Sequence, residues 1–412
     1  MKVNRIKSAL SVLDKEVILT LVSQFLSIVF PMVLLIYLAS FKGKDDVIAF
    51  EALLSLSAFF AILQDYGTSI FFSHRKYSKN KISRIVGTVL TLKVIISILS
   101  LFLILLIYNL LVIFSDFGID SSVFVLSGFV IFINSFDFPF VFYSKGKTHL
   151  YSFIVSLKYP VCLFFVFIGV DSLNSIVISS LLVVLLMFLL CLRWTGFNVT
   201  FSSRIFLYIL RKYRLFTFTE LFTGVFSQLD GFVVSQLLPK EQAFLYLFLR
   251  KFIRAANSLL NFVYRIAYTR SKLDSSVKKH FILALLLINA LGFVFYFFAM
   301  WVMKSYYPEL AVYESFYFYI TVLFQGSILI FGCLKSLVRN LHVFDGEQFK
   351  LHFYGTILSA ITFVLPVVLG LVFGFGLSAL TLSLFRVLSD LMYVIVILLS
   401  VVVFNCKGYK GV

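Results

Sequence analysis

The sequence predicts an all-α integral membrane protein, and three observations lead to this prediction. Among the 412 residues, 61% are hydrophobic and only 13% are charged, and the mean hydropathy is +1.03. A soluble domain keeps roughly a quarter of its residues charged so that its surface can face water. The apolar residues also fall into blocks of about 20 or more, the length of a helix that crosses a hydrocarbon core of ~30 Å. Only short connections separate these blocks.

Twelve membrane-spanning helices are predicted, in two sets of six. They lie at about 17–39, 47–72, 84–112, 121–143, 150–170, 175–194, 215–237, 242–267, 280–303, 313–336, 349–373 and 376–404. The longest connection, 195–214, carries a partly amphipathic segment. We therefore expect an N-terminal six-helix lobe at 1–194, a cytoplasmic linker at 195–214 and a C-terminal six-helix lobe at 215–412.

The distribution of basic residues predicts the orientation of these spans. With the N-terminus inside, the predicted cytoplasmic segments carry 26 of the 36 Lys and Arg residues, and the outer loops carry 4. Cytoplasmic loops of membrane proteins are enriched in Lys and Arg, so this asymmetry predicts that both ends lie in the cytoplasm. Because the basic residues follow membrane orientation, the net charge of +17 does not indicate a nucleic-acid partner.

Catalysis and cofactor binding are not indicated by any motif in the sequence. It contains no phosphate-binding loop, no metal-ligand spacing and no nucleophile elbow, and its four cysteines form no Cys-x-x-Cys pair. We therefore expect no catalytic residue, no metal and no cofactor. Because the loops are too short to hold a catalytic domain, the function is expected to lie within the membrane.

The predicted eighth span carries the most informative charges. Arg250, Arg254 and Asn257 share one helix face, because they are separated by four and three residues, and Lys251 lies beside them. Charged residues are costly at this depth and usually face a cavity or one another. One interpretation is a cationic surface for an anionic substrate, since Arg binds phosphate through two parallel hydrogen bonds. The alternative is pairing with acids on neighbouring helices.

Other charged residues in the spans have two interpretations each. Lys93 and Lys158 either extend back to the headgroups or contact substrate, and Arg386 either contacts substrate or forms an intrahelical pair with Asp390. Four acids are candidates for binding a coupling ion or for neutralising a cation: Asp65, Glu220, Asp230 and Asp390. Two further acids, Glu51 and Asp137, lie near span ends and are expected to be solvated.

Two segments resemble the Wzx-type O-antigen flippases. One is the stretch LQDYGTSI at 63–70, which is followed by a basic loop and by a span that carries Lys93. The other is the stretch FSQLD at 226–230 with RKFIRA at 250–255. The segment around Tyr143-Ser144-Lys145-Gly146 is similar to the junction of the fourth and fifth spans of these flippases, although the usual Trp and Gln-Gly pair are missing.

This resemblance implies a MATE-like fold, with two six-helix lobes around a central cavity that opens to each side in turn. It implies transport of an undecaprenyl-diphosphate-linked oligosaccharide repeat unit from the cytoplasmic to the periplasmic leaflet of the bacterial inner membrane. Membrane lipids, a polysaccharide polymerase and a chain-length regulator would then be partners. The basic residues of the spans would suit a diphosphate-sugar head group.

Two other functions remain open at the level of the sequence. A polysaccharide polymerase or ligase is also polytopic, but such enzymes generally need a sizeable outer loop, and the predicted outer loops are short. A drug or cation exporter on the same fold would favour an acidic, aromatic cavity rather than a basic one. The sequence therefore favours a transporter over an enzyme.

Overall fold

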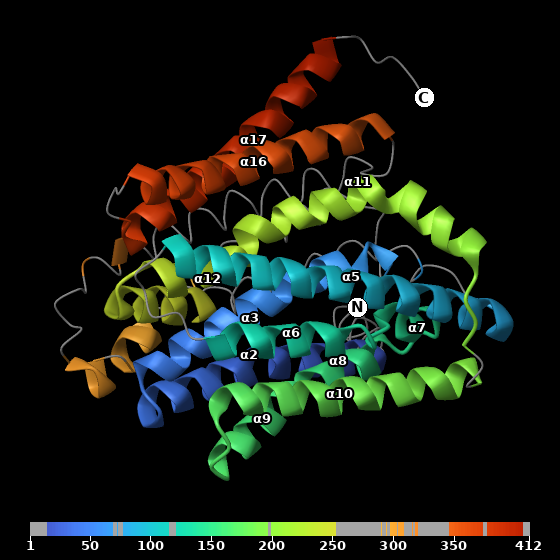
Figure 1. Ribbon diagram of the computed structural model, residues 1–412, viewed down its shortest axis with the longest axis horizontal. Coiled ribbons are helices and arrows are strands. Elements are labelled where there is room, and N and C mark those ends of the chain that lie inside the picture. Colours follow the sequence, from blue (N-terminus) through green and yellow to red (C-terminus); the bar gives the residue numbers. More distant parts are fainter. Residues whose placement is uncertain are drawn as a thin grey trace, which may run out of the picture. The chain divides into compact units, whose positions relative to one another are not determined.

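The computed structural model describes 15–68, 72, 77–114, 121–196, 199–252, 346–373 and 377–406, with scattered positions between 290 and 319. These residues form helices and connections, and no strand occurs among them. The helices, shown in Figure 1, are α2 (Lys15–Phe41), α3 (Lys44–Asp65), α5 (Lys79–Phe114), α6 (Ser121–Asn134), α7 (Pro139–Ser144), α8 (Thr148–Ser156), α9 (Lys158–Phe167), α10 (Ser172–Thr195), α11 (Ser203–Ser227), α12 (Leu229–Leu237), α16 (Gly346–Phe373) and α17 (Ala379–Cys406). Residues 240–252 are also helical.

Six helices in the described part of the chain are long and apolar enough to cross a membrane. They cover Lys44–Asp65, Lys79–Asn109, Ser121–Ser144, His149–Phe167, Ser172–Thr195 and Phe353–Gly370. Each corresponds to one of the spans that hydropathy predicts. The predicted spans at 280–303 and 313–336, and the second half of the one at 242–267, fall largely outside the described residues.

The chain divides into two compact units. Unit 1 combines the residues up to Tyr37 with Leu63–Arg214, and unit 2 combines Leu38–Ile62 with Leu215–Val412. Helices α2, α3 and α11 each run across a boundary between the units and so contribute residues to both.

Unit 1 is built around broken and unbroken spans packed side by side. Helix α10 packs against α6 and α9, and α5 packs against α6. The sequence analysis expected one continuous helix for each of the fourth and fifth spans, but both are interrupted. The fourth is split into α6 and α7 and the fifth into α8 and α9. Pro139 is the first residue of α7, a position where the missing N–H of proline leaves no helical hydrogen bond unmade.

In unit 2, helices α16 and α17 form a closely packed antiparallel pair (Figure 1). The hydroxyl groups of Ser359 and Ser389 form a hydrogen bond of 2.8 Å between them. Helix 240–252 buries a row of aromatic rings at every fourth position, Phe244, Phe248 and Phe252, with neighbouring ring centroids 5.7 and 5.0 Å apart. This row anchors the helix that carries Arg250.

Helix α3 ends at Asp65, seven residues before the predicted end of the second span. Tyr66 and Gly67 follow with φ angles of 44° and 70°, so two successive residues adopt the left-handed conformation. A left-handed residue ends a helix, and glycine adopts it at no steric cost. The Asp65-Tyr66-Gly67 segment therefore acts as a helix stop, which apolar content alone did not indicate.

Candidate functional site

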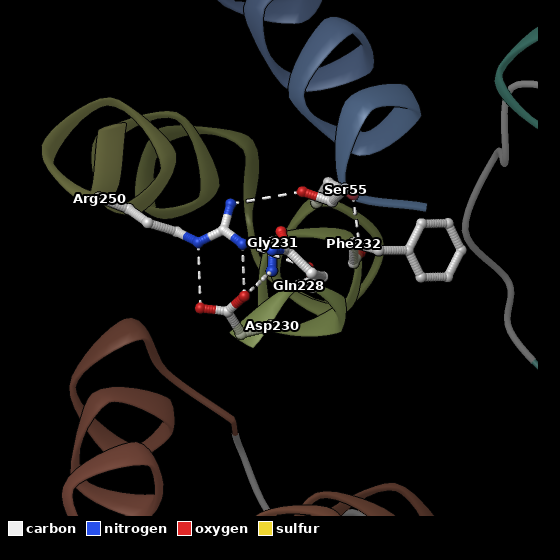
Figure 2. Close-up of polar contacts among 7 residues, drawn as sticks. Ser55, Gln228, Asp230, Gly231, Phe232 and Arg250 are labelled. Atoms are coloured by element: carbon white, nitrogen blue, oxygen red, sulfur yellow. Dashed lines mark hydrogen bonds and ion pairs between the residues drawn. The ribbon is translucent and has the colours of Figure 1, made fainter. Parts of the chain in front are cut away.

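In unit 2, Arg250 and Asp230 form a fully buried, two-pronged ion pair (Figure 2). The Arg250 Nε donates to Asp230 Oδ2 at 3.0 Å and Nη2 donates to Asp230 Oδ1 at 2.5 Å. Nη1 donates to Ser55 Oγ at 3.3 Å and Nη2 to the carbonyl oxygen of Gln228 at 3.2 Å. Both side chains of the ion pair are 2% exposed. The guanidinium is thus held by acceptors from α3, from α12 and from the residue before α12.

Helix α12 presents Asp230 to the arginine because its first turn is preceded by a short interruption. Helix α11 ends at Ser227 and α12 starts at Leu229, and the carbonyl of the intervening Gln228 accepts from Arg250 as well as from the Gly231 N–H at 3.3 Å. The backbone N–H of Gly231 donates to Asp230 Oδ1 at 2.8 Å. A side chain at position 231 would lie 2.5 Å from Ser55 Oγ and would overlap the guanidinium of Arg250. The glycine therefore makes room for the ion pair.

Lys251 forms a second, partly buried ion pair, with Glu51 of α3. The Lys251 Nζ lies 2.7 Å from Glu51 Oε1, and the two side chains are 18% and 3% exposed. Glu51 and Ser55 are one turn apart on α3, so one face of this helix supplies partners for both cations. The expectation that Glu51 is solvated is wrong, because its carboxylate is buried in this ion pair.

A buried polar cluster lies in unit 1 at the interruption between α6 and α7. The Gln64 Nε2 donates to the carbonyl oxygen of Ile131 at 2.6 Å and to Ser97 Oγ at 2.5 Å. The hydroxyls of Ser97 and Ser135 form a hydrogen bond of 2.5 Å. Non-helical backbone within a membrane span must have its polar groups satisfied by protein or water. These side chains provide that satisfaction for the first half of the break.

Lys93 provides the hydrogen-bond donor for the second half of the same break. Its Nζ donates to the carbonyl oxygen of Asp137 at 2.5 Å and lies 5.5 Å from the centre of the Phe138 ring. Lys93 is 4% exposed, so it does not extend back to the headgroups. The Asp137 Oδ2 accepts a hydrogen bond of 2.9 Å from the Tyr151 hydroxyl. Asp137, expected to be solvated, is thus part of a polar cluster.

The other described candidates are Arg386, Lys158 and Asp65, and Asp65 directly follows Gln64 in the chain. Arg386 and Asp390 form an intrahelical pair on α17, with 3.5 Å between Nε and Oδ2. Lys158 is the first residue of α9 and is partly buried. Asp65 is the last residue of α3, and its Oδ1 accepts from Thr68 Oγ1 at 3.3 Å.

The described part of the structure does not include the side chains of three predicted site residues. Arg254 and Asn257 lie outside the described residues, and of Glu220 only the backbone is described, within α11. The side-chain partners that the sequence analysis missed are Glu51, Ser55 and Gln64. A signal for Gln64 is its position directly before Asp65 in an apolar span, where an uncharged polar side chain also needs a partner.

Comparison with solved structures finds two similar chains with TM-scores of at least 0.6. One is the lipid II flippase MurJ in an inward closed conformation, with 16% sequence identity and a TM-score of 0.63 over 93% of this chain and 87% of that chain. The other is an inward-facing multidrug resistance MATE family transporter of the MOP superfamily, with 13% identity and a TM-score of 0.60 over 95% of this chain and 99% of that chain. No protein-family model and no curated protein matches the sequence.

These similarities and the helices described above define the class of the protein. It is a multi-pass, all-α membrane protein with the MATE-like fold, as the sequence analysis predicted.

Proposed function

We propose that this protein is a flippase that moves an undecaprenyl-diphosphate-linked oligosaccharide repeat unit from the cytoplasmic to the periplasmic leaflet by alternating access. The proposal includes a location in the bacterial inner membrane, with both termini cytoplasmic and a polymerase and a chain-length regulator as partners. The fold supports a transporter, since both similar structures are membrane transporters by their names. The observation that carries the proposal is the neighbouring pair of cations within unit 2, the buried Arg250 and the partly buried Lys251.

A buried cation in a membrane protein can bind an anionic ligand when that ligand can replace the acid that neutralises the cation. In this structure each cation is neutralised by one acid of the same unit. The Lys251–Glu51 pair is the more exposed of the two, so its carboxylate is the easier one for a phosphate to replace. Arg250 would then orient the diphosphate, while Arg254 and Asn257 would extend the surface along the same helix face.

The remaining candidates keep the roles that their contacts allow. Lys93, Lys158 and Arg386 stay candidates for substrate contact, although Lys93 is engaged by the Asp137 carbonyl and Arg386 by Asp390. Asp65, Glu220, Asp230 and Asp390 stay candidates for binding a coupling ion. Asp230 and Asp390 each have a cation at hydrogen-bonding or near hydrogen-bonding distance, so binding a proton or metal ion there would first require the ion pair to open.

A second candidate function is export of a cationic or drug-like compound. The observation that favours it is the similarity to the multidrug resistance MATE transporter, whose TM-score is close to that of the flippase. For such a substrate Glu51 and Asp230 would be the ligand-binding groups, and the basic residues would be their counter-ions.

A pair of charge-neutral double variants tests the flippase proposal. Arg250→Gln with Asp230→Asn removes both charges of the buried pair and keeps a polar side chain at each position. We expect a normal amount of protein in the membrane and a loss of surface polysaccharide in a deletion strain that expresses it. The matched control is Lys240→Gln with Asp45→Asn, which neutralises an exposed pair with 2.8 Å between Nζ and Oδ2. The control should support normal polysaccharide.

Normal polysaccharide from the buried double variant would mean that Arg250 is only structural, and the assignment of this site would fail. Loss of resistance to a cationic compound, with polysaccharide unchanged, would instead favour the exporter.

A further inference from the structure

The start of helix α11, at 203–212, has one face that packs inside unit 1 and an opposite face that stays exposed. The packed face is centred on Ile209, which is fully buried and belongs to the same core cluster as Ile82 of α5. The backbone N–H of Ser202 donates to Thr88 Oγ1 of α5 at 3.0 Å. These contacts fix the start of α11 against α5 and so determine which of its side chains point outward.

The exposed face combines cations with apolar side chains. Its members are Arg204, Leu207, Tyr208 and Arg211, which share one side of the helix at positions i, i+3, i+4 and i+7, with Lys212 beside them. The three cations are exposed, and Leu207 and Tyr208 are 49% and 47% exposed. The Lys212 Nζ lies 5.2 Å from the centre of the Tyr208 ring and donates to its hydroxyl at 2.9 Å. These five residues are called the basic face of α11 below.

Acids are missing from the sequence around the basic face. Neither Asp nor Glu occurs in 172–219, which includes α10 and the start of α11, or in 66–115, which includes α5. Where these helices meet, Lys79 of α5 lies so near the end of α10 that a side chain at Gly196 would come within 2.5 Å of its Cε. Further exposed cations of α5 and α10 are Lys81, Arg84 and Arg193. The surroundings therefore add positive charge to the basic face instead of neutralising it.

Membrane orientation explains the cations of this face but not the apolar side chains between them. Exposed Leu and Tyr side chains gain free energy by leaving water, and cations gain it by approaching phosphate groups. The boundary between lipid headgroups and acyl chains offers both environments side by side. The basic face also lies close to the headgroups, because α10 crosses the membrane directly before it and the predicted seventh span at 215–237 directly follows it.

We propose that the basic face of α11 binds anionic phospholipids of the bilayer. Arg204, Arg211 and Lys212 contact the lipid phosphate groups, the arginines through two parallel hydrogen bonds each and the lysine as a single point charge. Leu207 and Tyr208 insert between the upper parts of the acyl chains. Such a lipid belongs to the surrounding membrane and is not a transported substrate, so this inference does not depend on the proposed function.

Native mass spectrometry of the full chain in detergent, titrated with phosphatidylglycerol or with zwitterionic phosphatidylcholine, tests the proposal. Each Lys or Arg near an anionic lipid surface strengthens binding by a factor of about five. The triple variant Arg204→Gln, Arg211→Gln, Lys212→Gln should therefore bind phosphatidylglycerol at least about tenfold more weakly than the wild type does. Its binding of phosphatidylcholine should be unchanged. A monodisperse peak in size-exclusion chromatography shows that the variant is folded.

The matched control is Lys42→Gln, Lys145→Gln, Lys147→Gln, which removes three exposed cations from connections between helices and should bind phosphatidylglycerol as the wild type does. An equal loss in both triple variants would overturn the proposal, because net charge and not this face would then decide binding. Equal affinity of the wild type for the two lipids would overturn it as well. Displacement of phosphatidylglycerol by an equal concentration of polyglutamate or of inorganic diphosphate would also overturn it, and would assign the face to an acidic protein or to a free phosphate ligand.

Discussion

At the scale of single residues, the central feature is that the neighbouring cations Arg250 and Lys251 of unit 2 each have an acid partner. A buried pair is costly to desolvate, and removing one partner costs more, because the other charge stays in the protein interior. Asp230→Ala should therefore destabilise the protein by about 3–5 kcal/mol. The change in stability is measured by heating the protein in detergent. The loss of the monodisperse peak in size-exclusion chromatography reports unfolding at each temperature. The loss should be largely reversed in the neutral double variant Asp230→Asn with Arg250→Gln.

The same contact changes what is expected of Arg250→Ala. From the sequence alone, this variant should lose transport and keep its protein level. Because Asp230 is 2% exposed and would lose its cationic partner Arg250, the amount of folded protein should fall as well. For this reason the neutral double variant, and not the single alanine variant, separates a role in transport from a role in folding.

Gly231 gives a second test at this scale. An alanine methyl group at this position would overlap the Arg250 guanidinium and lie 2.5 Å from Ser55 Oγ. We expect Gly231→Ala to destabilise the protein by roughly 1–3 kcal/mol through overpacking. Gly355→Ala is the matched control, because a methyl group there would come no nearer than 3.3 Å to the ring edge of Tyr393 and 3.5 Å to Val396 Cγ1. Similar melting temperatures for the two variants would contradict the tight packing around the ion pair.

The sequence predicted that Arg250 and Lys251 are buried in a span, but it did not predict their partners. Helical spacing places residues on a face of their own helix, whereas the rotation of each neighbouring helix about its axis is set by packing over the whole bundle. Glu51 shows the consequence. Its position near a span end indicated a solvated carboxylate, yet α3 turns this face toward helix 240–252 and buries it.

At the scale of helices, the interruption between α6 and α7 depends on side chains from two other helices. Gln64 satisfies the carbonyl of Ile131, and Lys93 satisfies the carbonyl of Asp137. Gln64→Leu leaves the first carbonyl without a donor and should cost about 1–3 kcal/mol in stability. Gln236→Leu is the control, since that amide donates a hydrogen bond to the hydroxyl of the neighbouring Ser235 on its own helix. Equal thermal stability of the two variants would show that the break does not depend on Gln64.

Hydropathy predicted the fourth and fifth spans but not their division into two helices each. An average over some 20 residues cannot detect a break of one to four residues, since apolar residues lie on both sides of it. Pro139 was the local signal, because proline is favoured in the first turn of a helix and disfavoured in its interior. The stop after Asp65 has a comparable signal in Gly67.

At the scale of the whole molecule, the number and type of elements follow from simple physics. A backbone in hydrocarbon must satisfy its own hydrogen bonds, so long apolar blocks become helices. The MATE-like fold itself came from a resemblance carried by a few short segments, and the structure bears it out. The substrate does not follow from the fold, because both a lipid II flippase and a multidrug transporter share it.

The charge asymmetry makes a separate prediction about orientation. In a variant with all native cysteines replaced by serine, Lys42→Cys should react with a membrane-impermeant maleimide on intact spheroplasts. Lys145→Cys should react only after the membrane is opened. Both positions are exposed, so accessibility to water rather than burial decides the outcome. Labelling of Lys145→Cys in intact spheroplasts would contradict the predicted topology.

The most direct test of the flippase proposal is deletion of this gene in its own bacterium, followed by analysis of surface polysaccharide and of lipid-linked intermediates on each leaflet. The proposal predicts that surface polysaccharide is lost and that complete lipid-linked repeat units accumulate on the cytoplasmic leaflet. If single repeat units still reach the outside while chains fail to grow, the protein acts in polymerisation, and the flippase proposal is contradicted.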